Sequence, residues 1–401
     1  MRAVHSGFDV VGFDTDEARV KALAAGESYV EDIASTELAS ALASGHYRAS
    51  SDPADCAGFD VAVVTVPTPL REGNPDLSYI EAASRLLAPH LRPGASVVLE
   101  STTYPGTTEE LVAPLLEEGS GLVAGADFHL GYSPERIDPG NPSFGLANTP
   151  KVVSGIDAAS LAAVRDFYDR IVETTVAVSG CKEAELTKLL ENTFRHVNIA
   201  LVNELAMFAN DLGIDVWEAI DAASTKPFGY LRFTPGPGVG GHCLPIDPSY
   251  LSWRVRRSLG VSFRFVELAN DVNDHMPDYV VRRVSVALNR RRLAVNGSRI
   301  LLLGLAYKRN TSDARESPAL VVADRLLALG AEVHVVDPLV AEGHVDARMA
   351  RVELSAQELA GADAVVLLVD HDAFDLDLVV AHAGYVLDTR HRLSGPQVEH
   401  L

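Results

Sequence analysis

The stretch "GVGGHCLPIDP", residues 238–248, places Cys243 between glycines on one side and prolines on the other. Glycine permits positive φ and the close approach of a ligand to the backbone, whereas proline fixes φ. A loop built this way can hold a thiol at a defined point and leave room beside it, as a nucleophile requires. From this stretch alone, the alternative is a buried structural cysteine beside an ordinary turn, since free cysteine is among the most buried residue types.

Lys188 and Asn192 form a second candidate set, four residues apart in a stretch where apolar residues recur at helical spacing. They therefore share one face of the predicted helix, and Glu185 joins them three residues before the lysine. A lysine on a helix is usually a solvated surface charge. Beside a reactive cysteine and a cofactor cleft, it can instead polarise or deprotonate a hydroxyl group.

Acidic and basic residues follow the first apolar strand candidate, in "GFDVVGFDTDEARV" (7–20). In a Rossmann fold, a carboxylate at such a strand end hydrogen-bonds the adenosine ribose of NAD. Asp14 is the candidate for that contact, and Arg19 is placed to face a phosphate or the adenine. The alternative is a strand followed by an ordinary acidic helix N-terminus.

Hydroxyl residues, prolines and an acid follow three further apolar stretches. Ligands bind at the carboxyl ends of the strands in open α/β sheets, so these residues predict a cofactor cleft. The candidates are Pro67 and Thr68 in "TVPTPL", Thr102 in "ESTTYPGTTEE" and Glu135 in "GYSPERIDPGN".

Short β-branched runs alternate with Ala/Leu-rich amphipathic stretches, which is typical of βαβ units on a parallel sheet. Residues 182–223 interrupt this alternation and predict one long helix followed by a shorter one. We therefore expect an α/β fold with two Rossmann-like parallel-sheet domains joined by a long central helix. The expected boundaries are 1–180, 181–290 and 291–401. The strand candidates are residues 8–14, 59–66, 95–101, 151–155, 298–307, 331–338, 362–370 and 384–390.

The composition excludes several other classes of protein. The 401 residues carry a net charge of -21, which argues against nonspecific nucleic-acid binding but is compatible with a local basic pocket for phosphate. No apolar run reaches the roughly 18 residues that span a bilayer, and the first residues lack the layout of a signal peptide. The three cysteines are widely spaced without a CxxC pair, so we expect a cytoplasmic protein without disulfides or a metal site.

Three segments together resemble the nucleotide-sugar dehydrogenases of the UDP-glucose/GDP-mannose dehydrogenase family. They are "AELTKLLENTFRHVNIALVNELA", "TKPFGYLRFTPGPGVGGHCLPIDPSYLSW" and "LGLAYKRNTSDARESPAL", and the resemblance runs from about residue 7 to the end. The cysteine loop is most similar to the UDP-N-acetylglucosamine 6-dehydrogenase branch, whereas the UDP-glucose branch more often has "GFGGSCFPKD". His242 and Ile246 therefore favour UDP-N-acetylglucosamine or its mannosamine epimer over UDP-glucose.

The resemblance implies oxidation of the sugar C6 alcohol to a carboxylate with two NAD⁺. Cys243 would be the nucleophile that attacks the C6 aldehyde, and the resulting thiohemiacetal would be oxidised to a thioester that water hydrolyses. Lys188 and Asn192 would hold the C6 oxygen, and Asp247 would assist proton transfer through water. Thr102 and Glu135 would position the water and the nicotinamide.

The resemblance also implies contacts with the UDP-sugar and an assembly. Gly241, Lys308 and Arg390 would bind the substrate, and Arg315 would reach toward NAD. Family members dimerise through the central helix, and a helix as long as 182–211 with apolar residues around much of its circumference needs additional partners. We expect a cytoplasmic homodimer or larger assembly that serves polysaccharide biosynthesis.

The first residues depart from the family pattern. Only six residues precede Gly7, and no G-x-G-x-x-G occurs there, so the N-terminal domain is expected to lack its first strand and glycine-rich loop, on the order of 20 residues. Either the start codon was assigned too late, or the chain is truncated and binds NAD poorly. The alternatives are a UDP-glucose 6-dehydrogenase and a non-catalytic nucleotide-sugar-binding protein.

Overall fold

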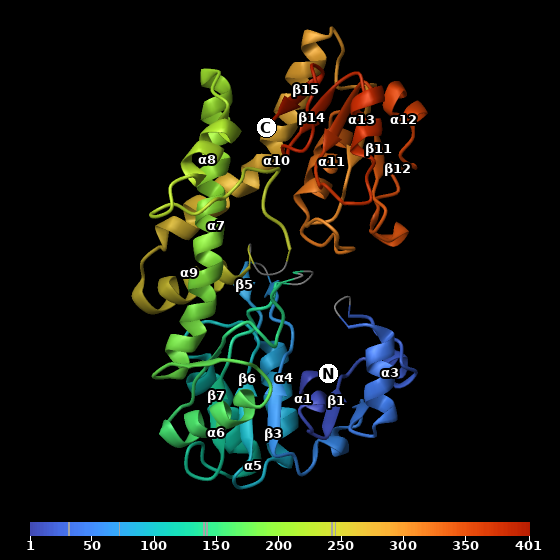
Figure 1. The fold of residues 1–401 in the computed structure, drawn as a ribbon. Coiled ribbons are helices and arrows are strands. Elements are labelled where there is room, and N and C mark those ends of the chain that lie inside the picture. The colour runs from blue at the N-terminus through green and yellow to red at the C-terminus, as the bar shows by residue number, and fades with distance from the viewer. Residues whose placement is uncertain (31–32, 72, 139–140, 142, 242–243, 245) are drawn as a thin grey trace. The chain divides into compact units, whose positions relative to one another are not determined.

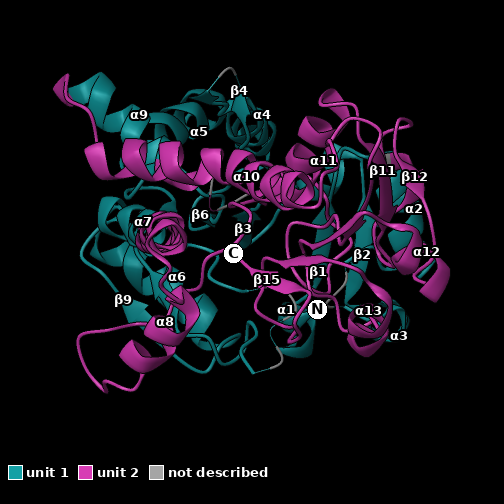
Figure 2. Ribbon diagram, turned by 90° about the horizontal axis from the view of Figure 1, so that it is seen from above, with its two compact units in different colours: residues 1–191, 249–258 teal, residues 192–248, 259–401 magenta. Residues whose placement is uncertain are grey.

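The β-branched runs of the sequence form parallel strands, and the Ala/Leu-rich stretches between them form helices (Figure 1). The computed structural model describes residues 1–30, 33–71, 73–138, 141, 143–241, 244 and 246–401. The chain divides into two units, residues 1–191 with 249–258 and residues 192–248 with 259–401 (Figure 2). Each unit has its own sheets and its own apolar core.

The first unit is built on a parallel sheet in the order β3-β6-β7. Its middle strand, β6, is buried along its whole length, which explains the continuous apolar run "SVVL". β1 and β2 form a separate parallel pair, as do β8 and β9. The strands of this unit are β1 (Val10–Phe13), β2 (Tyr47–Ser50), β3 (Val61–Val64), β4 (Leu70–Arg71), β5 (Asn74–Pro75), β6 (Ser96–Leu99), β7 (His129–Tyr132), β8 (Lys151–Val153) and β9 (Thr175–Ala177).

Two helices of this unit, α2 and α6, begin at acidic caps. Asp16, directly after the turn that ends β1, accepts hydrogen bonds from the N–H groups of Ala18 and Arg19 and so starts α2. Asp157 caps α6 in the same way through the N–H of Ser160. The helices are α1 (Arg2–His5), α2 (Glu17–Ala24), α3 (Ser35–Ala43), α4 (Ser78–Leu87), α5 (Ala113–Ser120) and α6 (Ala158–Asp169).

A central group of long helices interrupts the alternation, as the sequence predicted. α7 (Cys181–Leu212) begins in the first unit and ends in the second, and α8 (Val216–Ser224) follows it. α9 (Asp247–Leu259) and α10 (Arg264–Arg290) complete the group. The expected long helix followed by a shorter one is therefore confirmed.

The second unit holds a six-stranded parallel sheet in the order β12-β11-β10-β13-β14-β15. Numbered along the unit, this order is 3-2-1-4-5-6, the strand order of a Rossmann fold. The direction of winding reverses between β10 and β13, and ligands bind at such a switch point. The elements are β10 (Arg299–Leu303), α11 (Pro318–Ala328), β11 (Glu332–Val336), β12 (Ala350–Arg351), α12 (Ala356–Gly361), β13 (Ala364–Leu367), α13 (Leu376–His382), β14 (Val386–Asp388) and β15 (Val398–His400).

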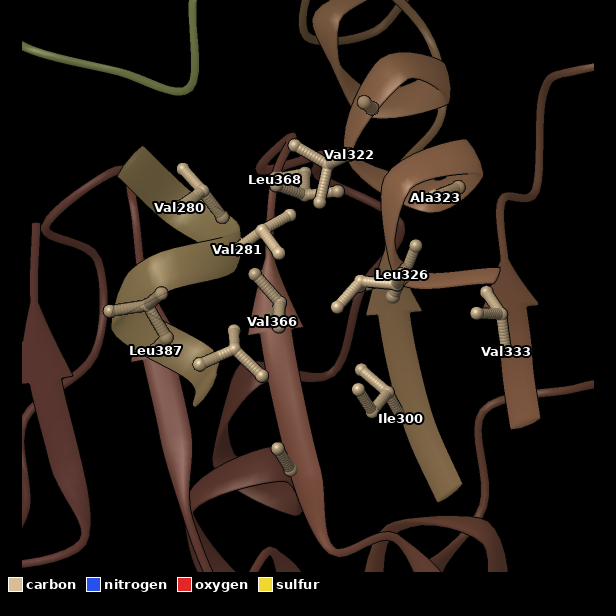
Figure 3. Close-up of a cluster of buried hydrophobic side chains, with 14 of the residues drawn as sticks. Val280, Val281, Ile300, Val322, Ala323, Leu326, Val333, Val366, Leu368 and Leu387 are labelled. Atoms are coloured by element: carbon tan, nitrogen blue, oxygen red, sulfur yellow. The ribbon is translucent and has the colours of Figure 1, made fainter. Parts of the chain in front are cut away.

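Both faces of this sheet are buried. Along β10, Ile300 and Leu302 pack into one apolar cluster, and Leu301 and Leu303 pack into another. Figure 3 shows the first cluster, where side chains of α10 and α11 meet those of β10, β11, β13 and β14. The strand ends that carry loops 304–317 and 368–374 are thus fixed by packing from two sides.

The expected α/β class with parallel sheets is confirmed. Each of the eight predicted strand ranges contains a strand, although β2, β4, β5, β7, β9, β12 and β15 lie outside the predicted set. Within the described chain, α1 precedes β1, and the expected lack of a first strand and glycine-rich loop stays a prediction. No helix among the described residues is long and apolar enough to cross a membrane.

Candidate active site

Three candidate loops of the first unit meet at one edge of the sheet. β3, β6 and β7 are parallel neighbours, so the segments that carry Thr68, Thr102 and Glu135 follow their carboxyl ends at the same edge. Ser101 Oγ donates a 2.8 Å hydrogen bond to the carbonyl oxygen of Val66, which ties the second loop to the first. The fold therefore brings these predicted residues to one side of the unit.

Lys188 contacts the third of these loops from α7. Its side chain is buried, and its Nζ donates a 2.6 Å hydrogen bond to the main-chain oxygen of Glu135. A buried ammonium with this partner is not the solvated surface lysine of the alternative interpretation. It is held on the loop that carries the Glu135 carboxylate.

A second buried lysine, which the sequence interpretation did not single out, compensates two acids. Lys151 Nζ lies 2.7 Å from Glu100 Oε1 and 3.7 Å from Glu135 Oε2, and it donates to the Pro134 carbonyl oxygen. Tyr168 donates from its hydroxyl to Glu100 Oε1 at 2.5 Å. Burial, followed by the negative charge of Glu100, raises the pKa of Tyr168 well above 10, so its hydroxyl stays a donor.

Glu185 fixes the loop that contains Thr102. Its fully buried carboxylate accepts hydrogen bonds from the N–H of Gly106 at 2.6 Å and from the N–H and hydroxyl of Thr108 at 2.9 and 2.7 Å. Burial raises the pKa of Glu185 to about 7, although these donors favour the charged form. Because Glu185 lies on α7, it holds the loop against the helix that also carries Lys188.

Asn192 and Asp247 form the corresponding pair in the second unit. Asn192 Nδ2 donates a 2.5 Å hydrogen bond to Asp247 Oδ2, and both side chains are buried. The two residues are 55 positions apart in the sequence, one on α7 and the other after the cysteine loop. The structure thus brings two residues that were predicted separately, the helix amide and the carboxylate after the cysteine loop, into direct contact.

The glycines before Cys243 are required by neighbouring protein atoms. A Cβ at Gly240 would lie 2.6 Å from the Glu316 carbonyl oxygen, and one at Gly241, where φ is +86°, would lie 2.8 Å from the Tyr307 ring. The close approach expected of a ligand is therefore made, on the Cβ side of these glycines, by the loop after β10. Residues His242, Cys243 and Pro245 lie outside the described residues.

The other two cysteines make poor nucleophiles by comparison. Cys181 is fully buried in the core, and burial raises the pKa of its thiol to about 12. Burial also raises the pKa of Cys56, which is half-buried. A thiol must ionise to attack, so neither environment favours catalysis at neutral pH.

The loop after β10 carries the predicted substrate residue Lys308 and lies at the switch point of the six-stranded sheet. Asp337 accepts hydrogen bonds from the N–H groups of Leu305 and Ala306, while His371 donates to it from Nε2. Burial opposes the charged form, but these donors hold the pKa of Asp337 well below its usual range. His371 Nδ1 accepts from the N–H of Asn310, so the loop is held at its start and near its middle.

Two further predicted residues of this unit have protein partners. Arg390 donates from Nε to the carbonyl oxygen of Leu368 at 2.6 Å, and burial lowers its pKa. Arg315 is exposed and forms two hydrogen bonds to Asp313 at 2.9 and 2.7 Å. Their predicted contacts with the substrate and NAD stay predictions.

Asp14 has the environment that a ribose diol requires. It directly follows β1, and its Oδ1 accepts the N–H of Asp16 at 2.9 Å while Arg19 NH1 lies 3.6 Å from Oδ2. The carboxylate is about a third exposed, which leaves acceptor positions for the two hydroxyls of an adenosine ribose. The residues present at this strand end therefore fit NAD. Among the described residues, no group of three or more metal-ligating side chains is placed to hold a metal ion.

Three family models match the chain in sequence order. The NAD binding domain of the UDP-glucose/GDP-mannose dehydrogenase family matches residues 1–172, its central domain matches 182–275, and its UDP binding domain matches 301–395. The chain belongs to this family. It is a nucleotide-sugar dehydrogenase, and NAD is its cofactor.

Curated relatives and solved structures agree with this membership. The chain is 37% identical to the UDP-N-acetyl-D-mannosamine dehydrogenase of Pyrococcus horikoshii over 92% of this chain and 85% of the relative. It is 36% identical to the UDP-N-acetyl-D-glucosamine 6-dehydrogenase of Pseudomonas aeruginosa over 91% and 86%. The solved structure of the P. horikoshii UDP-D-ManNAc dehydrogenase matches with a TM-score of 0.90 at 33% identity, over 100% of this chain and 94% of that one.

The contacts of the predicted residue Glu135 include residues that the sequence interpretation missed. Glu100 and Lys151 stand at the ends of apolar strands, where a charged residue in an otherwise apolar run was the available signal. Their pairing could not be read from the sequence, because the two residues are 51 positions apart.

Proposed function

We propose that this nucleotide-sugar dehydrogenase oxidises the C6 hydroxyl of UDP-N-acetylglucosamine or UDP-N-acetylmannosamine to a carboxylate. The N-acetylated sugar is supported by the sequence "GVGGHCLPIDP" around Cys243 and by the names of the relatives at 36 and 37% identity. The observation that carries the chemistry is the buried Asn192–Asp247 hydrogen bond. It holds a carboxylate base and an amide donor together, and the carboxylate is four residues after Cys243 in the sequence.

NAD⁺, when bound, accepts a hydride from C6 in each of the two oxidations. Lys188 supplies a positive charge from a buried position, where electrostatic stabilisation of a developing C6 alkoxide is stronger than in water. The main-chain oxygen of Glu135 holds that ammonium in place. Asn192, one helical turn further along α7, donates a second hydrogen bond to the oxygen at C6.

Cys243 forms the covalent bond. Its thiolate attacks the C6 aldehyde carbon, a C–S bond forms, and the carbonyl oxygen takes a proton to give a thiohemiacetal. Oxidation of that carbon gives a thioester. Water attacks the thioester, the C–S bond breaks, and the thiolate leaves as the carboxylate forms. Asp247 accepts the proton of the attacking water.

Glu135 and Thr102 position the water and the nicotinamide in this proposal. Lys151 Nζ lies 3.7 Å from Glu135 Oε2, and the carboxylate oxygens of Glu135 are acceptors for the hydrogen bonds of water. Asp14 and Arg19 hold the adenosine end of the cofactor. Pro67, Thr68 and Arg315 are the remaining cofactor contacts, and Gly241, Lys308 and Arg390 bind the UDP-sugar.

We also propose three functional parts, an NAD-binding domain over 1–180, a central helical region over 181–290 and a UDP-sugar-binding domain over 291–401. The family matches at 1–172, 182–275 and 301–395 support this division. A cytoplasmic location suits the mechanism, because Cys243 must remain a free thiol and the cytoplasm keeps thiols reduced. Polysaccharide biosynthesis is the process that such uronic acids serve.

A homodimer through α7 is the proposed assembly. Large apolar side chains recur along one stripe of this helix and are exposed, from 42% at Leu186 to 73% at Leu212. An exposed apolar stripe on a long helix is characteristic of a protein–protein contact. The stripe consists of Leu186, Leu190, Phe194, Leu201, Leu205, Phe208 and Leu212.

The substrate is tested by assaying the purified chain with NAD⁺ and a panel of UDP-N-acetylglucosamine, UDP-N-acetylmannosamine and UDP-glucose. We expect kcat/KM to be higher for an N-acetylated sugar than for UDP-glucose. A clear preference for UDP-glucose contradicts the substrate assignment. Calorimetric binding of a UDP-sugar without turnover of any sugar supports the non-catalytic alternative instead.

A further inference from the structure

A buried chain of hydrogen bonds runs through the second unit and ends at the glycine loop. The N–H of Gly236 donates to Asn203 Oδ1 at 2.9 Å, and Asn203 Nδ2 donates to Asn273 Oδ1 at 2.9 Å. Asn273 Nδ2 lies 3.4 Å from His196 Nδ1, and His196 Nε2 lies 2.7 Å from Asn270 Oδ1. The side chains of Asn203, His196 and Asn273 are at most 3% exposed.

The hydrogen bonds of this buried series all run in one direction, from donor to acceptor. If His196 carries its proton on Nε2, each group donates to the next, from the Gly236 N–H to the oxygen of Asn270. Burial lowers the pKa of His196, which favours the neutral ring that this arrangement needs. Asn203 is the member that connects α7 to the loop, because its amide both accepts from the loop and donates to Asn273 on α10.

The loop offers few other backbone donors at this point. Prolines 235 and 237 flank Gly236 and have no N–H group, so the Gly236 N–H is the only backbone donor in this three-residue stretch. Pro235, Gly236 and Pro237 are all buried. A buried N–H without a partner is strongly unfavourable, so Asn203 determines where this part of the loop lies.

The remainder of the described loop packs against fixed neighbours. A Cβ at Gly238, where φ is +133°, would lie 3.0 Å from Pro318 and 3.2 Å from the carbonyl oxygen of Asn273. Asn273 thus contacts the loop through its backbone as well as through the chain of hydrogen bonds. Fixing the position of Gly236 therefore also restricts the backbone as far as Gly241, two residues before Cys243.

We propose that Asn203 is a positioning residue, whose hydrogen bond to the Gly236 N–H fixes the glycine loop that leads to Cys243. The inference rests on the proposed role of Cys243 as nucleophile. Catalysis depends steeply on placement, since a 1 Å displacement of a reacting group can lower the rate by about 100-fold. Loss of the Asn203 amide is expected to lower kcat much more than it raises KM.

The test compares Asn203→Ala with Asn273→Ala. Both substitutions break the same buried chain, but only Asn203→Ala removes the acceptor of the Gly236 N–H. We expect Asn203→Ala to lower kcat by about 10- to 100-fold with both KM values within about threefold. Asn273→Ala is expected to retain kcat within about threefold of the native value, as is Asn210→Ala, which changes an exposed residue of the same helix. Equal losses of kcat in Asn203→Ala and Asn273→Ala would contradict the proposal.

Hydrogen exchange of the Gly236 amide gives a readout that needs no substrate. In the native protein this amide should exchange at least about 100-fold more slowly than in an unfolded peptide, and Asn203→Ala should remove that protection. Asn203→Asp keeps an acceptor oxygen and should preserve it. Fast exchange in the native protein overturns the proposal even if Asn203→Ala fails to fold. A protected amide in a chain without dehydrogenase activity would instead count against the proposed function alone.

Discussion

Asn192 Nδ2 lies 2.5 Å from Asp247 Oδ2, in a hydrogen bond between the middle of α7 and the first residue of α9. An ionised carboxylate accepts hydrogen bonds but cannot donate them, so the amide presents its N–H₂ group to Asp247 and the orientation of both side chains is set. In this pair Asp247 is therefore the base and Asn192 is the hydrogen-bond donor.

Replacement of Asp247 should lower kcat throughout the pH profile, whereas replacement of Asn192 by aspartate should shift the profile. Asp247→Asn removes the base and should lower kcat by about 100-fold or more at every pH. Asn192→Asp places two carboxylates within hydrogen-bond distance, which raises the pKa of one of them and should move the acidic limb of the kcat profile to higher pH. Profiles that coincide with the native one for both variants would contradict these roles.

The affinity for NAD⁺ should depend on Asp14. Asp14→Ala removes the carboxylate at the end of β1, and loss of hydrogen bonds to a charged group should raise the KM for NAD⁺ by about 10-fold or more, with kcat little changed. Asp9→Ala is the matched control, because Asp9 is highly exposed and its carboxylate contacts His46 on the surface. An unchanged KM for NAD⁺ in Asp14→Ala would remove Asp14 from the cofactor site.

Glu185 should make the stability of the fold decrease with pH. Its pKa is about 7 in the folded chain, above the 4.5 of an exposed glutamate, so between these values the folded state binds more protons than the unfolded state. Stability from this group is therefore present below about pH 4.5 and declines as the pH rises toward 7.

Urea unfolding at pH 5 to 8 tests this linkage against Glu185→Gln. The difference in free energy of unfolding, native minus variant, should fall by up to about 1.4 kcal/mol per pH unit between pH 5 and 7 and level off above it. Glu183→Gln, an exposed acid of the same helical turn, should show no such slope. A difference that stays constant or grows with pH would show that Glu185 is not buried as an acid of raised pKa.

Substitution in the apolar stripe of α7 should dissociate the proposed dimer. Leu205 and Phe208 are 46% and 56% exposed, and the double substitution Leu205→Glu with Phe208→Glu would bury like charges in the interface. Light scattering at micromolar concentration should give twice the 42.9 kDa chain mass, or more, for the native protein and one chain mass for the variant. Asn210→Asp, outside the stripe, should remain associated. A native monomer would refute the assembly.

Local spacing predicted part of the site and could not predict the rest. Asp14 and the pair Lys188 and Asn192 follow from a strand end and a helical repeat, both of which act over fewer than 20 residues. The Lys151–Glu100 ion pair depends on the placement of β8 relative to β6, which only the folded chain determines. Asn203 stands among apolar residues of α7, and its partner is a backbone N–H 33 residues away.

The glycines of the cysteine loop show the same limit. Their sequence indicated close approach by a ligand, whereas the structure places atoms of Tyr307, Glu316 and Pro318 against their Cβ side. The glycines in the sequence indicate positions where a side chain would not fit. The atoms that would clash with a side chain at Gly240 and Gly241 belong to a loop more than 60 residues later.

The covalent role of Cys243 is tested most directly by product analysis of Cys243→Ala with NAD⁺ and UDP-N-acetylglucosamine or UDP-N-acetylmannosamine, whichever the native chain prefers. The native protein should release two NADH for each UDP-uronate, measured by absorbance and mass spectrometry. Cys243→Ala should form no UDP-uronate, whereas Cys56→Ala should retain native activity because Cys56 lies in a short turn outside the proposed site. Formation of uronate by Cys243→Ala at a near-native rate would contradict the central claim.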